Sequence, residues 1–324
     1  MDSTALTRRE FVKAGAAGAA ALALGSTLPL DAAGMPTRPF GRTGHHVKLF
    51  SLGGQATLER PGTHDESIAI INRAIDLGVN YIDTAARYGR GISQTNIGEV
   101  MKTRRREVFL ASKTHDRTRD GSLQLLEESL RLLQTDHLDL WQLHNIQYDE
   151  QLDTIFGKGG AIEAMQKARD AKMVRFLGIT GHFDPDVLLR GIQRFDFDTI
   201  LMALNPADKH HRAFTEKLLP LANEKKMGII AMKIPARGRL FRPDGVTSMK
   251  DAMRYVLTLP VSTVIVGCDT VAQLEENVAI ATAFTPMPTT EMTRLETLTA
   301  GYVSQASWFK RDAAGWTRPG DDDQ

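Results

Sequence analysis

The sequence predicts an α/β protein with a single domain folded as a (β/α)8 TIM barrel, followed by an extra C-terminal helix and tail. Three observations lead to this prediction: eight short apolar segments, amphipathic helical patterns between them, and a suitable length. About 291 residues remain once an N-terminal signal segment of about 33 is set aside, and a barrel of this type takes ~250 residues. The apolar segments are residues 47–52, 79–82, 108–111, 138–143, 175–179, 199–204, 228–232 and 261–266.

Amphipathic helical patterns separate these apolar segments. In the first, Ile68, Ile71 and Ile75 share one face before Gly78 ends the helix. In the second, leucines recur at three- and four-residue spacing between positions 123 and 133. Apolar strands alternating with helices indicate parallel pairing with both faces of the sheet buried. Further helical patterns fit residues 162–171, 187–192, 215–225, 249–257, 271–282 and, after the last strand, about 291–301.

An open doubly wound sheet is the alternative arrangement for alternating strands and helices. Its usual dinucleotide signature is Gly-x-Gly-x-x-Gly between the first strand and the first helix. The corresponding turn begins Gly53-Gly54-Gln55 here and does not match, so the closed barrel is favoured. No linker-like composition interrupts the chain after residue 47. We therefore assign residues 34–302 to one barrel domain and residues 303–324 to a C-terminal tail.

Residues 1–33 have the layout of a bacterial secretory signal. The adjacent pair Arg8-Arg9 and then Lys13 precede residues 14–24, which consist only of Ala, Gly and Leu. This apolar run falls short of the ~20 residues that a spanning helix needs. The pattern resembles a twin-arginine signal, which implies export to the periplasm through the Tat translocation machinery. An amphipathic N-terminal helix is the alternative, and cleavage fits either after residue 25 or near residues 32 and 33.

Charge and cysteine content exclude several classes of protein. The chain has 40 Lys and Arg against 39 Asp and Glu, too even a balance to gather nucleic acid on a broad basic face. The single cysteine, Cys268, excludes an internal disulfide, and we expect it to be buried. Adjacent histidines, His45-His46 and His210-His211, point to opposite sides of a strand, so we expect no metal site. The three arginines at 104–106 are expected to lie in solvent.

Four unlike polar residues stand at the ends of three consecutive predicted strands. Asp83 and Tyr88 follow the second strand, Lys113 the third and His144 the fourth. Active sites of (β/α)8 barrels lie at the carboxyl ends of the strands, so one mouth should hold all four. A nearby lysine favours the phenolate and is expected to lower the pKa of Tyr88. Asp83 would keep Lys113 charged, and His144 would hydrogen-bond a carbonyl. Capping or simple hydrogen bonding is an equal alternative for Asp83 or His144 alone, but not for the whole set.

At these residues the sequence resembles the aldo-keto reductase family. The resemblance covers nearly all of the chain after the signal segment, and the combination of motifs is specific although each motif alone is weak. The matching motifs are Phe40-Gly41-Arg42-Thr43-Gly44, Asp83-Thr84-Ala85 with Tyr88, then Lys113, His144 and Glu275-Glu276-Asn277.

The resemblance implies an NAD(P)-dependent oxidoreductase. Such an enzyme interconverts an aldehyde or ketone, sugars included, and an alcohol by hydride transfer. Tyr88 would be the general acid in reduction and the base in oxidation. Asp83 and Lys113 would tune its acidity, and His144 would orient the carbonyl. A non-catalytic, cofactor-binding regulatory barrel is the alternative function.

The resemblance also implies cofactor contacts at the ends of the later strands, where the match is weaker. The family usually has Ser-Asn after strand five, where this chain has Thr180 and Gly181, and Met232 replaces a common aromatic residue. The basic residues after strand seven would meet the pyrophosphate or lie in solvent. The candidates are Thr180, Gly181, His182, Met232, Lys233, Arg237, Gly238, Asp269, Gln273, Glu276 and Asn277.

The choice between NADP and NAD depends on the last strand and helix. Members that prefer NADP typically carry basic residues there, whereas this chain has Asp269 and Gln273. A carboxylate repels a 2′-phosphate and accepts a hydrogen bond from a ribose hydroxyl. The family as a whole favours NADP(H), so we predict NADP(H) and retain NAD(H) as the alternative.

Two further expectations concern the C-terminal segment and export. Trp308, Phe309 and Trp316 either wall the substrate pocket, as the C-terminal loop does in the family, or pack against the barrel. Free nicotinamide cofactor is scarce outside the cytoplasm, and the twin-arginine route carries folded proteins. We therefore expect the cofactor to be loaded before export and to stay tightly bound.

Overall fold

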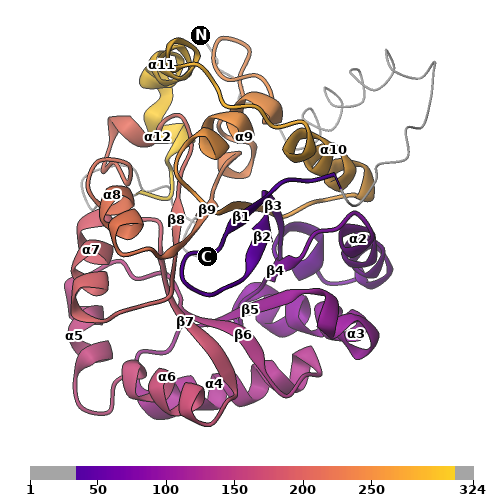
Figure 1. Cartoon of the computed structure of the whole chain (residues 1–324), viewed down its shortest axis with the longest axis vertical. Helices are drawn as coiled ribbons and strands as arrows, with labels where there is room; N and C mark the ends of the chain where they lie inside the picture. The colour runs from indigo at the N-terminus through magenta and orange to yellow at the C-terminus, as the bar shows by residue number, and fades with distance from the viewer. Residues whose placement is uncertain (1–33, 311–324) are drawn as a thin grey trace.

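The computed structural model describes residues 34–310, which form a closed barrel of eight parallel strands (Figure 1). The strands follow one another round the barrel in chain order, and β10 pairs with β3 to close it. This confirms the predicted (β/α)8 barrel over the doubly wound sheet. The barrel strands are β3 (Phe50–Gly53), β4 (Tyr81–Asp83), β5 (Phe109–Thr114), β6 (Leu138–Leu143), β7 (Val174–Gly181), β8 (Thr199–Ala203), β9 (Gly228–Met232) and β10 (Thr263–Val266).

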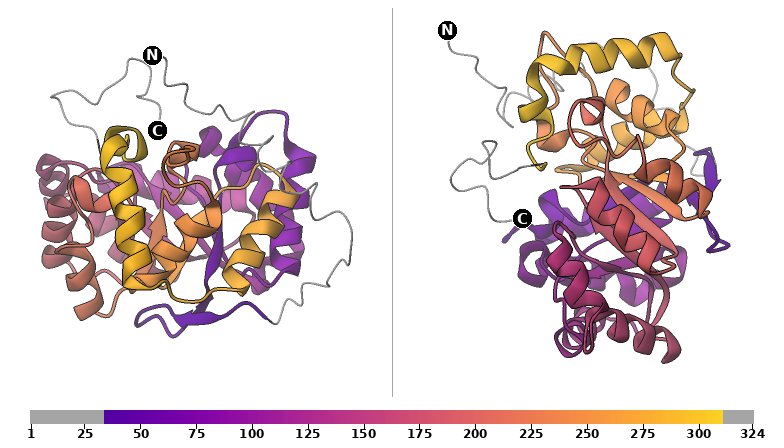
Figure 2. Two further views of the ribbon diagram at one scale, coloured as in Figure 1. Left: turned by 90° about the horizontal axis from the view of Figure 1, so that it is seen from above. Right: turned by 90° about the vertical axis from the view of Figure 1, so that its left-hand side faces the viewer.

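Helices surround the barrel and bury its outer face (Figure 2). All six residues of β6 are buried, as expected for a strand covered on both sides. The α-helices are α2 (His64–Asp76), α3 (Ile92–Arg104), α4 (Arg119–Leu133), α5 (Asp149–Phe156), α6 (Ala161–Asp170), α7 (Pro185–Arg194), α8 (Leu218–Glu224), α9 (Met249–Thr258), α10 (Val271–Thr282), α11 (Thr289–Thr299) and α12 (Val303–Ala306). Short 3-10 helices are η1 (Ala56–Glu59), η2 (Tyr88–Gly91), η3 (Arg105–Glu107), η4 (Asp208–His210), η5 (Ala236–Gly238) and η6 (Ala300–Tyr302).

Three of these helices, α3, α5 and the four-residue α12, have no counterpart among the predicted helical segments. The buried face of α3 carries Ser93, Gln94 and Asn96 beside Ile97, so no continuous apolar stripe marks it in the sequence. These polar groups are paired inside the fold: Gln94 Nε2 donates to the hydroxyls of Ser112 and Ser129 at 2.8 Å each. α5 is only eight residues long, which is too short for a periodic pattern to stand out.

An antiparallel hairpin of β1 (Thr37–Pro39) and β2 (His46–Lys48) lies across the N-terminal end of the barrel (Figure 1). The predicted first strand, residues 47–52, was therefore wrong as one element, because its first residues belong to this hairpin and only the later ones to β3. The reason is that the hairpin also buries apolar residues: Val47 and Phe40 are fully buried on the barrel floor. There the Phe40 ring meets Phe109 edge-on, with 5.4 Å between ring centroids.

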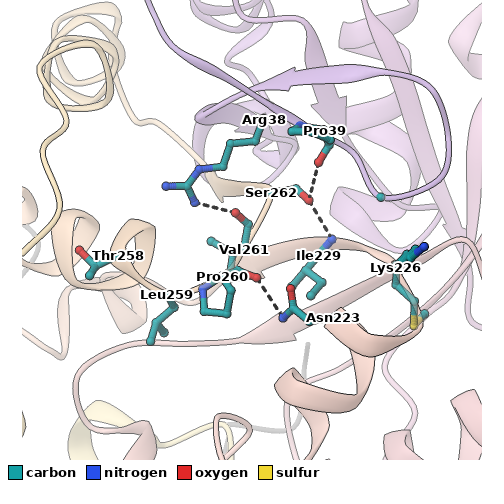
Figure 3. A pocket seen from close by; sticks show the side chains of 12 residues that line it. Arg38, Pro39, Asn223, Lys226, Ile229, Thr258, Leu259, Pro260, Val261 and Ser262 are labelled. Atoms are coloured by element: carbon teal, nitrogen blue, oxygen red, sulfur yellow. Dashed lines mark hydrogen bonds between the residues drawn. The ribbon is translucent and has the colours of Figure 1, made fainter.

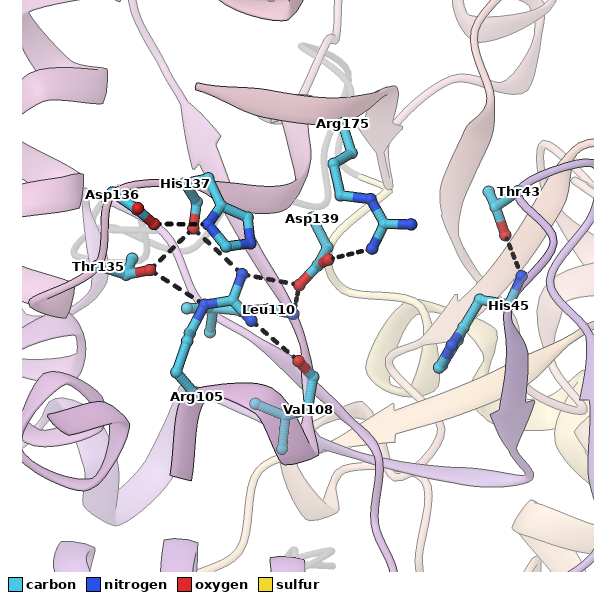
Figure 4. Close-up of polar contacts among 10 residues, drawn as sticks. All are labelled: Thr43, His45, Arg105, Val108, Leu110, Thr135, Asp136, His137, Asp139 and Arg175. Atoms are coloured by element: carbon cyan, nitrogen blue, oxygen red, sulfur yellow. Dashed lines mark hydrogen bonds and ion pairs between the residues drawn. The ribbon is translucent and has the colours of Figure 1, made fainter. Parts of the chain in front are cut away.

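A polar network at the same end fixes the start of β6 (Figure 4). Asp139 is 4% exposed and accepts hydrogen bonds from Arg105 at 2.9 Å, Arg175 at 2.7 Å and the Leu110 backbone N–H at 2.9 Å. Arg105 also donates to the carbonyl of Val108 at 3.0 Å. The expectation that all three arginines at 104–106 lie in solvent was therefore wrong for Arg105. Polar groups at this end of a barrel support stability rather than chemistry.

An open cleft beside the hairpin also lies at the N-terminal end of the barrel (Figure 3). Its polar groups join the hairpin to the barrel. Arg38 donates to the carbonyls of Val261 at 2.6 Å and Leu257 at 2.7 Å, and Ser262 Oγ donates to the carbonyl of Pro39 at 3.1 Å. These donors are already hydrogen-bonded, so the polar groups of the cleft hold the hairpin on the barrel.

The C-terminal segment remains packed on the barrel beyond residue 302, the predicted domain boundary. α12 follows directly, and Trp308, Phe309 and Lys310 are all buried. The boundary is therefore corrected to residue 310 at least, because two large aromatic side chains find apolar contacts on the barrel. Residues 1–33 and 311–324, which include the predicted signal and Trp316, lie outside the described residues.

Residues 34–310 contain neither a candidate membrane span nor a candidate metal cluster. No helix in this range is long and apolar enough to cross a membrane. Within the same range no group of three or more His, Cys, Asp or Glu side chains is arranged to hold a metal ion.

Candidate active site

Three of the four predicted strand-end residues are in direct contact inside the barrel. Lys113 Nζ pairs with Asp83 Oδ2, and each side chain is 1% exposed. The same ammonium group donates to the Thr84 carbonyl at 2.9 Å and to the Tyr88 hydroxyl at 3.2 Å. A buried carboxylate, an ammonium and a phenol therefore form one connected chain, with the phenol at its outer end.

His144 completes the group from the next strand. Its ring meets the Tyr88 ring edge-on, with 5.6 Å between centroids and 83° between planes. The backbone N–H of His144 donates to the Thr114 carbonyl at 2.8 Å, which extends the β5–β6 pairing to this residue. The fold thus brings Asp83, Tyr88, Lys113 and His144 to one mouth, although they span more than 60 residues of sequence.

Burial and the ion pair set the charge of these groups. Burial opposes the charge of Lys113, but Asp83 and Tyr88 outweigh it and raise the pKa of the ammonium. Burial raises the pKa of Tyr88 above its usual value, and Lys113 reduces this rise only in part. The expected lowering of the Tyr88 pKa was therefore wrong in net direction. Burial, followed by the charge of Lys113, holds the pKa of His144 well below its usual value. At neutral pH the site therefore has a neutral phenol and a neutral imidazole.

The sequence analysis missed a residue that holds Asp83. Gln142 Nε2 donates to Asp83 Oδ1 at 2.9 Å, and Gln142 lies opposite Lys113 in the β5–β6 register. It stands two residues before His144, so the alternation of strand side chains was the available signal. Gly178 makes room for it: a Cβ at Gly178 would lie 2.9 Å from Gln142 Cγ and 2.5 Å from Thr199 Oγ1.

Thr180 and Gly181, at the end of β7, contact the backbone that follows His144. Thr180 Oγ1 accepts a hydrogen bond from the backbone N–H of Asn145 at 2.8 Å. A Cβ at Gly181 would lie 2.7 Å from the carbonyl of Ile146, so a larger residue does not fit there without a shift. Gly181, where the resemblance leads one to expect Asn, thus leaves room for the Ile146 carbonyl.

The loop after β9 gathers positive charge around one indole ring. Lys233 Nζ and the guanidinium carbons of Arg237 and Arg239 lie 5.3, 5.7 and 4.7 Å from the Trp308 ring centroid. Trp308 Nε1 donates to the Ala236 carbonyl at 3.2 Å. Met232 ends β9 just before this loop and is partly buried. Such a loop fits an anionic group such as a pyrophosphate, and Gly238 lies within it with a φ of 84°.

Trp308 and Phe309 therefore pack against loops at the carboxyl end of the barrel. The Phe309 ring lies 6.1 Å from the ring of His182, which follows β7 directly. Both aromatic residues are buried. Trp308 and Phe309 can therefore both pack against the barrel and wall a substrate pocket, because the surface that they cover is at the mouth of the barrel.

The loop after β10 carries Asp269, the carboxylate expected to repel the 2′-phosphate of NADP. Asp269 pairs with Arg60, which comes from the loop after β3 and also donates to Thr57 Oγ1 at 2.7 Å. Gln273 Oε1 accepts from the backbone N–H of Asp269 at 2.6 Å. The carboxylate of Asp269 is thus partly neutralised, and its repulsion of a phosphate is weaker than the sequence suggested.

The nearby α10 residues differ in burial. Asn277 is buried and its amide donates to Cys268 Sγ at 3.6 Å, whereas Glu276 is exposed. Cys268 is fully buried, as predicted, and burial raises the pKa of its thiol to about 12. The thiol is therefore unreactive in the folded protein.

Comparison with known proteins agrees with this fold. Residues 50–248 match the model of the aldo/keto reductase family. This match spans more than half of the chain, so the protein belongs to the aldo/keto reductase family. It is accordingly an NAD(P)-dependent oxidoreductase that acts on carbonyl and alcohol groups.

Individual relatives share about a quarter of the sequence. An uncharacterized oxidoreductase of Bacillus subtilis, YqkF, is 26% identical over 68% of this chain and 83% of its own length. L-galactose dehydrogenase of Arabidopsis thaliana is 27% identical over 76% of this chain and 88% of its own. The solved holo form of the aldo-keto reductase AKR11C1 from Bacillus halodurans is 25% identical, with a TM-score of 0.70 over 82% of this chain and 96% of its own.

Proposed function

We propose that Tyr88 is the general acid that protonates the carbonyl oxygen during reduction, and the general base that takes this proton back during oxidation. The observation that carries this proposal is that Lys113 Nζ contacts both Asp83 and the Tyr88 hydroxyl inside the barrel. A phenol that donates its proton leaves a phenolate, and the adjacent ammonium stabilises that negative charge.

The remaining residues of the site orient the reacting carbonyl. His144 is neutral at neutral pH, so its imidazole can donate one hydrogen bond to the carbonyl oxygen while Tyr88 donates the proton. Gln142 keeps Asp83 turned toward Lys113. Bound nicotinamide cofactor supplies or receives the hydride at the carbonyl carbon. One hydride and one proton added to a carbonyl give the alcohol, so the reaction is balanced in both directions.

We propose NADP(H) as the cofactor, held across the carboxyl ends of β7, β9 and β10. The basic loop around Trp308 supports binding of the pyrophosphate, and Arg60 offsets the carboxylate of Asp269. Met232 would lie under the nicotinamide ring. The full set proposed to hold the cofactor is Thr180, Gly181, His182, Met232, Lys233, Arg237, Gly238, Asp269, Gln273, Glu276 and Asn277.

Sugars are one proposed substrate class. One relative, L-galactose dehydrogenase of Arabidopsis thaliana, is named for a sugar substrate, which supports this proposal. A panel of aldehydes, ketones and aldoses, assayed with NADPH in reduction and with NADP in oxidation, tests the class. A substrate that turns over at least tenfold better than the rest of the panel would define it.

The Tyr88→Phe variant tests the catalytic assignment. General acid catalysis contributes ~10²–10⁴-fold, so kcat should fall by about that factor while cofactor binding is retained. The matched control is Tyr148→Phe, which makes the same change at an exposed ring. Unchanged turnover in Tyr88→Phe would contradict the assignment, and no turnover of any substrate by the wild type would favour the alternative of a regulatory, cofactor-binding barrel.

We further propose that residues 1–33 are a cleaved twin-arginine signal and that the enzyme works in the periplasm. Changing Arg8 and Arg9 together to Lys should keep the protein in the cytoplasm, as measured by cell fractionation. Equal export of both proteins would contradict the proposal.

The proposal that the cofactor travels with the enzyme has a separate test. The protein is purified from the periplasm and denatured, and the supernatant is assayed for nicotinamide dinucleotide. About one molecule released per chain is the expected result, and an empty protein is the contrary one. The same assay identifies the cofactor as NADP or NAD.

A further inference from the structure

A group of basic side chains stands beside the site on the loops that follow β4 and β5. Arg87 comes just before Tyr88, and His115 and Arg117 follow β5 closely. The charges of Arg117 and His115 both act on the buried imidazole of His144. These groups therefore lie near His144, and none of them has a role in the proposed proton transfer.

Arg117 is positioned by the backbone next to His144. Its Nη2 donates to the carbonyls of His144 at 2.8 Å and Asn145 at 3.1 Å. Its Nη1 is buried and has no hydrogen-bond partner among residues 34–310. Buried donors of this kind are normally paired, so this nitrogen of Arg117 is a donor still able to bind an acceptor.

The neighbouring Arg87 also lacks an anionic partner among the described residues. Arg87 is exposed and forms no hydrogen bond or ion pair in the described part of the chain, and its charge lowers the pKa of both His115 and Arg117. Burial is the main cause of the lowered pKa of Arg117, which falls to about 10, so the side chain is still cationic at neutral pH. A bound anion would relieve the repulsion between these two arginines.

The acidic groups of this region are occupied elsewhere. Asp83 pairs with Lys113 in the interior. Asp116 is the acid nearest to Arg117 in sequence, and its Oδ1 accepts from the backbone N–H of Thr118 at 2.7 Å and from the Thr118 hydroxyl at 2.6 Å. Asp116 offsets part of the positive charge but does not reach Arg117 within ion-pair distance. A net positive charge remains on this side of the mouth.

The cofactor does not account for these basic residues. The loop proposed to meet the pyrophosphate follows β9, and in the closed barrel three strands separate β5 from β9 in either direction. The group around Arg117 is therefore on the opposite side of the mouth from the Lys233 and Arg237 loop. The other ligand that the proposed reaction requires is the substrate.

We propose that Arg87 and Arg117 form an anion subsite, so that the preferred carbonyl or alcohol substrate carries a carboxylate or a phosphate group. The inference rests on the proposed function of Tyr88 and narrows its substrate class. Both anions present the oxygen acceptors that a guanidinium binds in pairs. His115 follows β5 beside them, and its Nδ1 is buried without a hydrogen-bond partner among the described residues.

Matched aromatic aldehydes test the subsite. 4-Carboxybenzaldehyde and methyl 4-formylbenzoate share the ring and the aldehyde and differ in one negative charge, and 4-formylphenyl phosphate supplies the other anion. Wild-type kcat/KM should be at least tenfold higher for one anion than for the ester and should fall with added salt. The better of the two anions identifies the group. A higher kcat/KM for the ester would overturn the proposal.

Variants separate the subsite from a general effect of charge. Arg87→Gln and Arg117→Gln should each lower the anion-to-ester ratio about fivefold or more. Arg90→Gln is the control, because it removes a positive charge from the same loop at an exposed residue that acts on neither His115 nor Arg117. Its ratio should match the wild type. Arg87 is exposed, so Arg87→Gln remains informative if Arg117→Gln does not fold; an unchanged ratio in Arg87→Gln overturns the proposal.

A binding measurement keeps this test independent of turnover. Terephthalate should bind the cofactor-loaded protein more tightly than monomethyl terephthalate in isothermal titration calorimetry, and Arg87→Gln should remove the difference. Reduction of the ester without preference for an anion refutes the subsite and leaves the proposed function standing. Absence of all turnover together with selective terephthalate binding refutes the function and leaves the subsite standing.

Discussion

Lys310 and Asp208 form an ion pair in which both side chains are buried, at 0% and 2% exposure. Lys310 Nζ also donates to the carbonyls of His211 and Arg212 at 3.0 Å each. The pair joins the last described residue to the loop after β8. Because Trp308 and Phe309 come directly before Lys310, it also fixes these two aromatic residues against the mouth of the barrel.

Replacing Lys310 with Met should destabilise the fold strongly. Removal of one partner leaves the other charge buried, which costs about 3–5 kcal/mol. Urea denaturation of the wild type and the variant measures this change. Lys209→Met is the matched control, since Lys209 pairs with Glu296 at the surface and such pairs contribute about 1 kcal/mol or less. Equal effects of the two variants would mean that the buried pair does not anchor the segment.

Replacing Lys113 with Met should change the pH dependence of alcohol oxidation. Oxidation needs the phenolate of Tyr88. Burial raises the pKa of Tyr88 and Lys113 reduces that rise, so loss of Lys113 moves the pKa of Tyr88 further upward. The rising limb of kcat against pH should therefore shift to higher pH, and kcat at pH 7 should fall about 100-fold. Lys102→Met, at an exposed position, is the control; an unshifted profile in Lys113→Met would exclude this electrostatic role.

Replacing Asp139 with Asn should lower stability at neutral pH but not at acid pH. Burial opposes the charge of Asp139, but Arg105, the Leu110 N–H and Arg175 outweigh it and lower the pKa of the carboxyl. A lowered folded-state pKa gives stability that is present above the unfolded value of about 3.9 and is lost as the pH falls through the folded value. The variant should lose about 2 kcal/mol at pH 7.

This loss should shrink below pH 4, and guanidinium denaturation at both pH values measures it. Asp136→Asn is the control, because Asp136 is exposed and pairs only with neighbouring His137. A loss that stays constant with pH would attribute the effect to packing instead of charge.

Replacing Arg60 with Ala should reduce the preference for NADPH. The change leaves the carboxylate of Asp269 without its partner, and the resemblance to aldo-keto reductases puts that carboxylate near the 2′-phosphate. The ratio of kcat/KM for NADPH to that for NADH should fall about three- to fivefold, as expected for loss of about 1 kcal/mol at a partly exposed pair. Asp269→Ala should move the ratio in the opposite direction. A shift of both variants in one direction would contradict the electrostatic argument.

Much of the fold was predictable because its signals are local. Each barrel strand is a short apolar run, and helices such as α2 and α10 present a periodic face or a capped start. α3 escaped prediction because much of its buried face is polar, and the partners of its Gln94 Nε2 lie on β5 and α4. The hairpin strand β2 was not predicted as a separate strand. No residue in the apolar run 47–52 marks the point where the hairpin ends and β3 begins.

The placement of the four candidate site residues at one mouth was predictable for a different reason. A barrel gathers the residues that follow its strands at one end, so Asp83, Tyr88, Lys113 and His144 could be placed together from sequence order alone. Their acidity could not be predicted, because the net pKa of Tyr88 depends on how far burial outweighs one ammonium 3.2 Å away. The same holds for Asp269, whose partner Arg60 is more than 200 residues earlier in the chain.

The sequence by itself determined the order of the strands, the family and the residue types of the site, since these depend on local pattern and on chain order. Only the tertiary structure decided which charges are paired. Asp83, Asp116, Asp208 and Asp269 each have partners, whereas Arg87 and one nitrogen of Arg117 have none among the described residues. The physical reason is that Coulomb energy and desolvation depend on separations in space, and residues distant in sequence set those separations.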